Sequence, residues 1–451
     1  MIKDMTKGTP WKLIFAFMVP VCCGNIFQNF YNIVDSMIVG RFLGVEALAA
    51  VGSTSSINFL VIGWIVGMTS GFGIQLSQAF GADDKKRLRH YLAMAVYLCI
   101  GLAILMTAGL LAANTTILQW MNTPEDIFSN TKKYIGIIYA GLPVTILYNM
   151  LATVARALGD SKTPLYFLIL SSVLNIILDF VFVAMLPFGV AGAAYATVLS
   201  QAVSAVLCLI YVWKKFPIIH FSKKDAVIKG RSIYNLLAMG IPMGLQFSIT
   251  AIGTMIVQAS LNTLGATYIA AYSATMKIQN IVTQVYPALG TAIATYSGQN
   301  YGAGEMNRIK KGVNACLIIE AVYSILIMTL SWSVFPMSVR IFAEDPTGEL
   351  QMIACQMFRI SMWFFFPLGS IFIYRNVLQG LGNGFVPMLG GVFELIARAL
   401  VIEIGFDSMQ FTAICISDPA AWISALIPLI PYYYWFMNKK LKISGVEDTI
   451  N

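Results

Sequence analysis

Long apolar runs separated by short polar connections organise this chain. Each run reaches the roughly 20 mostly apolar residues that a membrane-spanning helix needs. The pattern therefore predicts an all-α membrane protein with twelve transmembrane helices. The runs lie near residues 14–42, 47–79, 90–115, 133–157, 164–187, 190–213, 233–263, 267–298, 312–338, 352–380, 386–408 and 414–437.

The composition supports this interpretation and excludes two other classes. Of the 451 residues, 58% are hydrophobic and only 11% are charged. Soluble domains carry about 25% charged residues, and a chain of this size could not bury so much apolar surface in water. Intrinsic disorder is excluded as well, because disordered segments are poor in apolar residues.

The two halves of the chain repeat each other. Matching motifs recur in the same order at nearly one offset: Leu43-Gly44 with Leu264-Gly265, Gln78-x-x-Gly81-Ala82 with Gln299-x-x-Gly302-Ala303, and Leu158-Gly159 with Leu381-Gly382. Six helices per half is an even number, so both halves enter the membrane in the same direction. We therefore expect two parallel six-helix repeats, an N-lobe over residues 1–221 and a C-lobe over residues 222–451. Such repeats are typical of transporters, with the substrate site between the halves.

The basic residues predict the orientation. When the N-terminus, the C-terminal tail and every second loop are placed on one side, that side holds 22 of the 29 Lys and Arg residues. The positive-inside rule then predicts that both termini and the 214–232 loop are cytoplasmic, in a plasma or inner membrane. The net charge of +8 is accordingly a topology signal and does not indicate nucleic-acid binding.

A few polar side chains inside the apolar runs are candidates for ion coupling. Asp35 lies on a polar face of the first run, Asn175 and Asp179 lie one turn apart in the fifth, and Thr197 lies in the sixth. Unpaired buried carboxylates are costly, so these positions need a function or a partner. Their oxygens suit a hard cation such as Na⁺. Alternatively, two nearby carboxylates would share one proton, because like charges disfavour joint ionisation. The residues leave H⁺ and Na⁺ open.

Further polar positions are weaker candidates. Amide side chains that would line a substrate cavity are Asn32, Gln201, Gln279, Asn280 and Gln284. Glu394 and Arg398 are spaced i, i+4, which favours a structural ion pair on one helix face over a transport role. Lys277 and the isolated Glu320 also fall within apolar runs. The sequence does not decide whether these charged residues are structural or functional.

Other chemistry is absent from the sequence. It contains no nucleotide-binding G-x-x-x-x-G-K-[ST] loop, no nucleophile elbow and no H-E-x-x-H. The seven cysteines all lie in apolar segments and the two histidines lie in basic loops, so we expect no resident metal. We therefore expect no enzyme activity, no cofactor and no obligate protein partner.

Several motifs together resemble one transporter family. The segment from Pro20 to Gly52, which contains Val39-Gly40-Arg41-Phe42-Leu43-Gly44, is similar to the first helix of MATE (multidrug and toxic compound extrusion) transporters. Ala157-Leu158-Gly159-Asp160-Ser161-Lys162-Thr163-Pro164 and Gly189-Val190-Ala191-Gly192-Ala193-Ala194 resemble further MATE signatures. The resemblance covers both halves and implies a V-shaped fold of two six-helix lobes, with drug efflux driven by inward H⁺ or Na⁺.

The resemblance also implies a coupling site. Asp35, Asn175, Asp179 and Thr197 match the N-lobe cation site of the prokaryotic branch. Another branch uses acids in the first helices of the C-lobe, but no Asp or Glu occurs here between residues 226 and 304. The expected function is an antiporter that exports amphipathic, often cationic compounds by alternating access. The alternative is a flippase for a lipid-linked precursor, which would need a basic cavity; Lys277, Arg359 and Arg398 are its candidates. Neither the physiological substrate nor the oligomeric state follows from the sequence.

Overall fold

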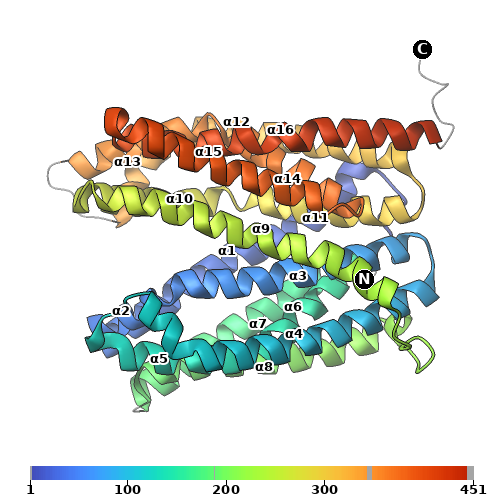
Figure 1. Cartoon of the computed structure of the whole chain (residues 1–451), viewed down its shortest axis with the longest axis horizontal. Coiled ribbons are helices and arrows are strands. Elements are labelled where there is room, and N and C mark those ends of the chain that lie inside the picture. Colours follow the sequence, from blue (N-terminus) through green and yellow to red (C-terminus); the bar gives the residue numbers. More distant parts are fainter. Residues whose placement is uncertain (1–2, 187, 343–347, 444–451) are drawn as a thin grey trace. The chain divides into compact units, whose positions relative to one another are not determined.

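The computed structural model describes residues 3–186, 188–342 and 348–443, and in that part of the chain every regular element is a helix (Figure 1). In chain order they are α1 (Pro10–Leu43), α2 (Val45–Ser53), α3 (Ser55–Gly81), α4 (Lys85–Trp120), α5 (Glu125–Ala140), α6 (Leu142–Ala157), α7 (Lys162–Asp179), the π-helix η1 (Phe180–Met185), α8 (Gly189–Lys215), the 3₁₀ turn η2 (Pro217–Ile219), α9 (Gly230–Asn262), α10 (Ala266–Val282), α11 (Val285–Gly302), α12 (Met306–Phe342), α13 (Glu349–Met362), α14 (Phe365–Gly380), α15 (Phe385–Met409) and α16 (Phe411–Ile443).

The helices follow the twelve apolar runs. Within the described ranges, nine helical segments are long and apolar enough to cross a membrane, with α2 and α3 counted as one. Two bent pairs raise this to eleven: α5 with α6, bent by 46°, and α13 with α14, bent by 49°. The remaining run corresponds to α10 and α11, which have 17 and 18 residues. The all-α membrane fold is therefore confirmed, and the helix count agrees in outline with the prediction.

The duplication extends from the sequence to the backbone. Gly44 and Gly265 precede equivalent helices and have φ angles of 86° and 97°. Gly159 and Gly382 have φ angles of 80° and 87° at the second repeated motif. Positive φ is the region in which glycine is favoured, so the repeated glycines conserve turns of the same shape in both halves. The two bent pairs, α5 with α6 and α13 with α14, are also equivalent in the repeats.

The helices form two compact units. Unit 1 contains residues 23–244 with the start of the chain, and unit 2 contains residues 5–22 and 245 onward. Accordingly, the first part of α1 packs in unit 2 and the first part of α9 packs in unit 1. The division of the two repeats at residues 221 and 222 stays a prediction, and the last eight residues of the predicted cytoplasmic tail lie outside the described residues.

Each unit has its own apolar core. In unit 1, close packing of α3 against the first part of α9 depends on glycine. A Cβ atom added at Gly71 would lie 2.6 Å from Gly240 Cα, and one at Gly67 would lie 2.5 Å from the Met243 carbonyl oxygen. Small residues four apart let helices approach closely in membranes, which is the role that the spacing of these glycines predicts. The resulting bundle holds α1, α5, α7 and α8 around the polar residues of unit 1.

Candidate functional site: a buried acid pair and a buried charge network

Two carboxyl groups from distant parts of the chain meet inside unit 1. Asp35 comes from the second part of α1, and Asp179 is the last residue of α7. Asp179 has no exposed surface and Asp35 is half-buried. The two carboxyl groups lie close enough to interact with each other. Like charges at short range disfavour joint ionisation, so this arrangement, which we name the acid pair, suits a proton or a small cation held between the two groups.

Asn175 and Thr197 supply neutral groups beside the acid pair. In the orientation that satisfies both ends of its amide, Asn175 donates to Asp179 Oδ2 at 2.8 Å and accepts from the Thr197 backbone N–H at 3.1 Å. In the opposite orientation, its Nδ2 atom donates to Thr197 Oγ1 at 3.3 Å. The Thr197 hydroxyl also donates to the carbonyl of Ala193 at 3.0 Å. Asn175 therefore links α7 to α8 at the acid pair.

Two tyrosines complete the surroundings, and sequence reasoning missed both. Tyr31 lies within hydrogen-bonding reach of Thr197 and close to both carboxyl groups. The sequence could have indicated Tyr31, because it lies four residues before Asp35 and therefore on the same helix face. Tyr134 on α5 also lies near Asp35 and Asp179. Nothing in the sequence pattern places α5 at this site, so Tyr134 could be found only from the structure.

No base neutralises the acid pair. Within the described part of the chain, neither Asp35 nor Asp179 forms a salt bridge with Lys or Arg. The Oδ1 atoms of both residues are buried and have no hydrogen-bond partner there. Burying charge without a partner is expensive, so the site favours a bound proton or a small cation. The α7 helix also widens into the π-helix η1 directly after Asp179. Such wide turns frequently occur at functional sites.

The predicted cavity residues have different surroundings. In unit 1, Gln201 accepts a hydrogen bond from Thr145 at 2.9 Å, and Asn32 is exposed. In unit 2, Gln279 is buried with an unpartnered Oε1 atom, Asn280 is exposed and Gln284 is half-buried. The role of these five side chains in a substrate cavity stays a prediction.

Unit 2 contains a buried charge network. Arg398 Nη1 lies 3.6 Å from Glu394 Oε2, the i, i+4 pair anticipated from the sequence. Arg398 Nε also donates to Asp418 Oδ1 at 2.9 Å, and Arg375 Nη2 donates to Glu394 Oε1. We name these four residues the charge network; it joins α14, α15 and α16. Its formal charges sum to zero, so it needs no further ion.

Arg375 is a basic residue that the sequence pattern did not single out. It lies inside α14 with 6% of its surface exposed, within the apolar run of residues 352–380. The buried carboxylate of Glu394 explains this position, because a paired arginine can lie within an apolar helix. Sequence reasoning also passed over Asp418, although a lone acid in an apolar run was a signal.

Glu320 is a third kind of buried acid. It lies on α12, has no exposed surface, and accepts from the Ser370 hydroxyl at 3.3 Å to each carboxyl oxygen. Gly369 leaves the space for it, since a Cβ atom there would lie 2.5 Å from Glu320 Oε1. Glu320 therefore has a polar neighbour, and within the described ranges it forms no salt bridge.

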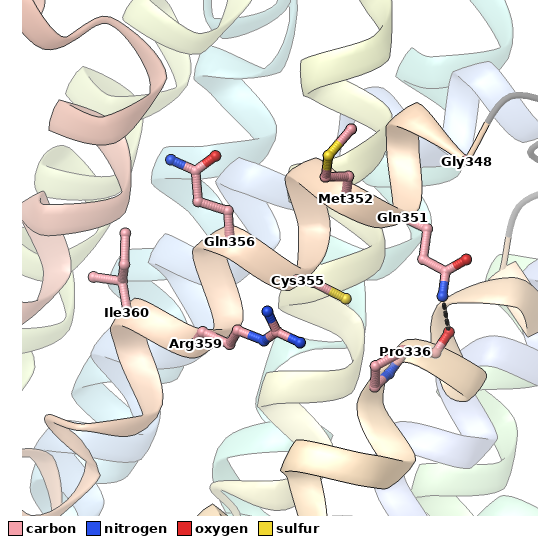
Figure 2. A pocket seen from close by; sticks show the side chains of 8 residues that line it. All are labelled: Pro336, Gly348, Gln351, Met352, Cys355, Gln356, Arg359 and Ile360. Carbon is pink, nitrogen blue, oxygen red and sulfur yellow. Dashed lines mark hydrogen bonds between the residues drawn. The ribbon is translucent and has the colours of Figure 1, made fainter.

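A groove in unit 2 carries one positive charge (Figure 2). It has a volume of about 560 Å³ and lies between α13 and the Pro336 region of α12. Arg359 lines it, and its guanidinium lies 4.8 Å from the centre of the Trp332 ring. None of the predicted coupling or cavity residues lines this groove.

Across the described ranges, no cluster of three or more His, Cys, Asp or Glu side chains could hold a metal ion.

The fold and the polar sites together define a multi-pass membrane protein of the transporter class. The MatE family model matches residues 20–181 and 242–402. The chain therefore belongs to the MatE family, and the resemblance found in the sequence is confirmed.

Relatives and solved structures agree with this assignment. The chain is 28% identical to "Probable multidrug resistance protein YoeA" of Bacillus subtilis (strain 168), over 97% of this chain and 96% of that protein. It is 32% identical to "Probable multidrug resistance protein YpnP" of the same organism, over 84% of each. A structure described as the outward-facing conformation of a multidrug resistance MATE family transporter matches with a TM-score of 0.89 at 20% identity, over 97% of this chain and 98% of that one. This structural likeness shows the shared fold.

Proposed function

We propose that this protein is a secondary active multidrug efflux antiporter that exports amphipathic, often cationic compounds in exchange for H⁺ or Na⁺. Full-length similarity to multidrug resistance proteins supports the substrate class. The observation that carries the coupling is the acid pair: two neighbouring carboxyl groups, one fully buried and one half-buried, with no basic partner among the described residues. Such a site changes its charge whenever it takes up or releases a cation.

Asp35 and Asp179 bind the coupling ion in this proposal, and Asn175 and Thr197 lie beside them as neutral polar groups. The ion loads the site from outside, rearranges the first helix and lowers the affinity for substrate. Coupling requires that the ion binds one conformation more tightly than another. The position of Asp35 on α1 suits this requirement, because a change at the acid pair acts on a helix with an internal proline, Pro20.

The protein resides in the plasma or inner membrane in this proposal, with both termini and the 214–232 loop cytoplasmic. The distribution of basic residues supports that orientation. A thiol placed at position 220 by His220→Cys should react with a membrane-impermeant maleimide only after the cells are opened. The unsubstituted protein measures the background from its native cysteines. Labelling from outside intact cells would overturn the topology.

A lipid-precursor flippase is the alternative, and it needs a basic central cavity. Arg398 does not supply free positive charge, because Glu394 and Asp418 neutralise it. Arg359 lines the groove of Figure 2, and none of the predicted cavity residues lines that groove. No observation favours the flippase over the antiporter. An intramembrane enzyme is disfavoured because no nucleophile or metal constellation occurs in the sequence.

Transport in proteoliposomes tests the proposal. The purified protein should move a labelled cationic dye against its gradient when a pH or Na⁺ gradient is imposed, and varying the two gradients independently identifies the ion. Asp35→Asn should remove the ion dependence. Movement of a labelled lipid-linked phosphate, without ion-driven movement of the dye, would instead establish the flippase.

A further inference from the structure

The segment between α8 and α9 is held in a defined place on unit 1. We name residues 216–229 the central loop. Arg89 Nε on α4 donates to the Ile218 carbonyl at 3.1 Å, and the two ring nitrogens of His90 lie 2.9 Å from the Asp225 carbonyl and 2.9 Å from Ser232 Oγ. A turn closed by Ser222 and Asp225 shapes the loop, with two contacts of 2.9 and 3.0 Å to the Asp225 carboxylate. The central loop is therefore held against α4 by several hydrogen bonds.

The docking extends well inside α4. The Tyr97 hydroxyl donates to the Ala226 carbonyl at 3.4 Å. Tyr97 lies twelve residues after the first residue of α4, Lys85, which corresponds to about 18 Å along the helix axis at 1.5 Å per residue. Because α4 is long and apolar enough to cross a membrane, this contact places part of the loop along the side of a spanning helix. Tyrosine is enriched at that level of membrane proteins.

Two apolar side chains are exposed where the central loop approaches α9. Val227 is 56% exposed and Ile228 is 66% exposed. Tyr234, one turn into α9, is 70% exposed. Packing inside unit 1 does not explain these side chains. A partner with an apolar layer would cover them.

Basic residues lie before and after Val227 and Ile228 in the sequence. Lys223, Lys224, Lys229 and Arg231 are all exposed and form no ion pair in the described ranges. The one acid among them is Asp225, and hydrogen bonds from the Ser222 amide and hydroxyl lower the pKa of its carboxyl. Asp225 thus stays ionised within its own turn, close to Arg89 and His90 of α4. The outward surface of the loop is left positively charged.

We propose that the central loop is an interfacial anchor that binds anionic phospholipids, with Val227 and Ile228 inserted among the acyl chains and Lys223, Lys224, Lys229 and Arg231 on the phosphate groups. Apolar side chains combined with a basic rim match the two layers of an anionic membrane surface. Free phosphate or a soluble acidic protein would use the charges and leave Val227 and Ile228 exposed to water. The anchor does not depend on the proposed antiport, so its test needs no transport assay.

Retention of lipid by the purified full-length protein tests this proposal. The protein is equilibrated with an equimolar mixture of phosphatidylglycerol and phosphatidylcholine, transferred to a neutral detergent, and the lipids that remain bound are counted by native mass spectrometry. Unsubstituted protein should retain phosphatidylglycerol preferentially. K223Q/K224Q/K229Q/R231Q should reduce this preference on the order of tenfold, because each basic side chain near an anionic surface strengthens binding.

A matched control removes four other exposed charges, as K85Q/K86Q/K310Q/K311Q. It should retain the preference, since those lysines have no exposed apolar pair beside them. V227N/I228N should lower the total lipid retained without changing the ratio of the two lipids. Thermal unfolding midpoints check that each variant is folded.

Three results would overturn the anchor. The loop charge variant could keep the full preference for phosphatidylglycerol. The control variant could lose as much of it as the loop variant, which would mean a diffuse effect of net charge. The apolar variant could retain as much lipid as the unsubstituted protein, which would leave Val227 and Ile228 outside the membrane.

Discussion

The acid pair of unit 1 and the charge network of unit 2 bury the same number of carboxyl groups with opposite charge balance. Asp35 and Asp179 lie beside each other and form no salt bridge within the described residues, whereas Glu394 and Asp418 lie against Arg375 and Arg398. A cluster that sums to zero is satisfied by its own side chains. A cluster of two acids without a base is satisfied only by a proton or cation from outside the chain. This difference supports our proposal that unit 1 carries ion coupling, and it fits a structural role in helix assembly for the charge network of unit 2.

The two units also differ at equivalent turns. Asp160 of unit 1 accepts from Lys215 Nζ at 2.8 Å. In unit 2, Asn383 stands at the corresponding position and donates to the Tyr432 hydroxyl at 2.6 Å. Both side chains hold the turn between a bent pair and the next helix. One uses an ion pair and the other uses neutral hydrogen bonds, so duplication kept the geometry and allowed the charges to change.

The largest expected effect is the loss of coupling in Asp35→Asn and in Asp179→Asn. Each change keeps the shape but removes a titratable charge, and we expect ion-driven export to fall by at least about tenfold while the protein still folds. The double variant should be no worse than the stronger single variant, because groups that act as one site are non-additive. Flux in proteoliposomes measures this. Wild-type ion dependence in Asp179→Asn would move the coupling site elsewhere, with Glu394 and Arg398 examined next.

Glu394→Gln should break the charge network, and its main effect should be a lower free energy of unfolding. The change leaves the buried guanidinium groups of Arg375 and Arg398 with one carboxylate between them, and removal of one partner from a buried ion pair costs about 3–5 kcal/mol. The free energy of unfolding in detergent measures the loss. The ion dependence of the folded fraction should stay unchanged. A shifted ion dependence would contradict the division of roles between the two units.

Asn175→Ala and Thr197→Ala should weaken the ion dependence without abolishing it. Both residues supply neutral groups beside the acid pair, and only Asn175 donates to it, a hydrogen bond worth about 1.5–3 kcal/mol when the acceptor is charged. The apparent affinity for the coupling ion, measured in the same flux assay, should therefore shift about tenfold or more in Asn175→Ala and less in Thr197→Ala. Asn376→Ala is a suitable control, because Asn376 is a helix amide in unit 2 that donates to its own helix. An unchanged ion affinity in both unit 1 variants would exclude Asn175 and Thr197 from the site.

Asp160→Asn should change the pH dependence of stability. Burial alone would raise the pKa of Asp160, but hydrogen bonds from Lys215 and Thr163 outweigh it and lower the pKa below its usual value. A lowered pKa in the folded state means that ionised Asp160 stabilises the fold above about pH 4 and that this contribution is lost as the pH falls further. Thermal unfolding between pH 3 and pH 7 should show this loss in the unsubstituted protein and a flatter profile in Asp160→Asn. Identical profiles would contradict the ion pair with Lys215.

Glu320→Gln should have the smallest effect. The amide keeps an acceptor for the Ser370 hydroxyl and removes no salt bridge, so we expect the free energy of unfolding to change by less than about 1 kcal/mol. It is the matched Glu-to-Gln control for Glu394→Gln. A loss of ion coupling in Glu320→Gln would show that unit 2 carries a titrating group of its own.

Much of the fold could be predicted from the sequence, because every membrane-spanning helix needs a run of about 20 mostly apolar residues. Twelve apolar runs predicted the helices, and the repeated glycine motifs predicted the duplication that the φ angles of Gly44 and Gly265 display. The i, i+4 spacing of Glu394 and Arg398 also predicted their contact within one helix. These features depend on local composition or on helical periodicity, which a linear pattern contains.

The sites depend on contacts between helices, and these are only partly visible in the sequence. Asp35 and Asp179 were candidates because a membrane makes any buried acid conspicuous, but their closeness to each other and to Tyr134 follows from tertiary packing. Arg375 was not a candidate, because a basic residue near the end of an apolar run stands out only when its buried partner, Glu394, is known.

The sequence by itself determined that this chain is a duplicated helical membrane protein, because hydrophobic length and repeat spacing are local properties of the chain. The tertiary structure decided which charges find partners. Arg398 lies against Asp418, twenty residues away on another helix, while Asp35 lies against another acid. Whether a buried charge is neutralised within the chain or by an ion from outside depends on distances of a few ångströms between helices. Packing sets those distances, and the order of residues along the chain does not state them.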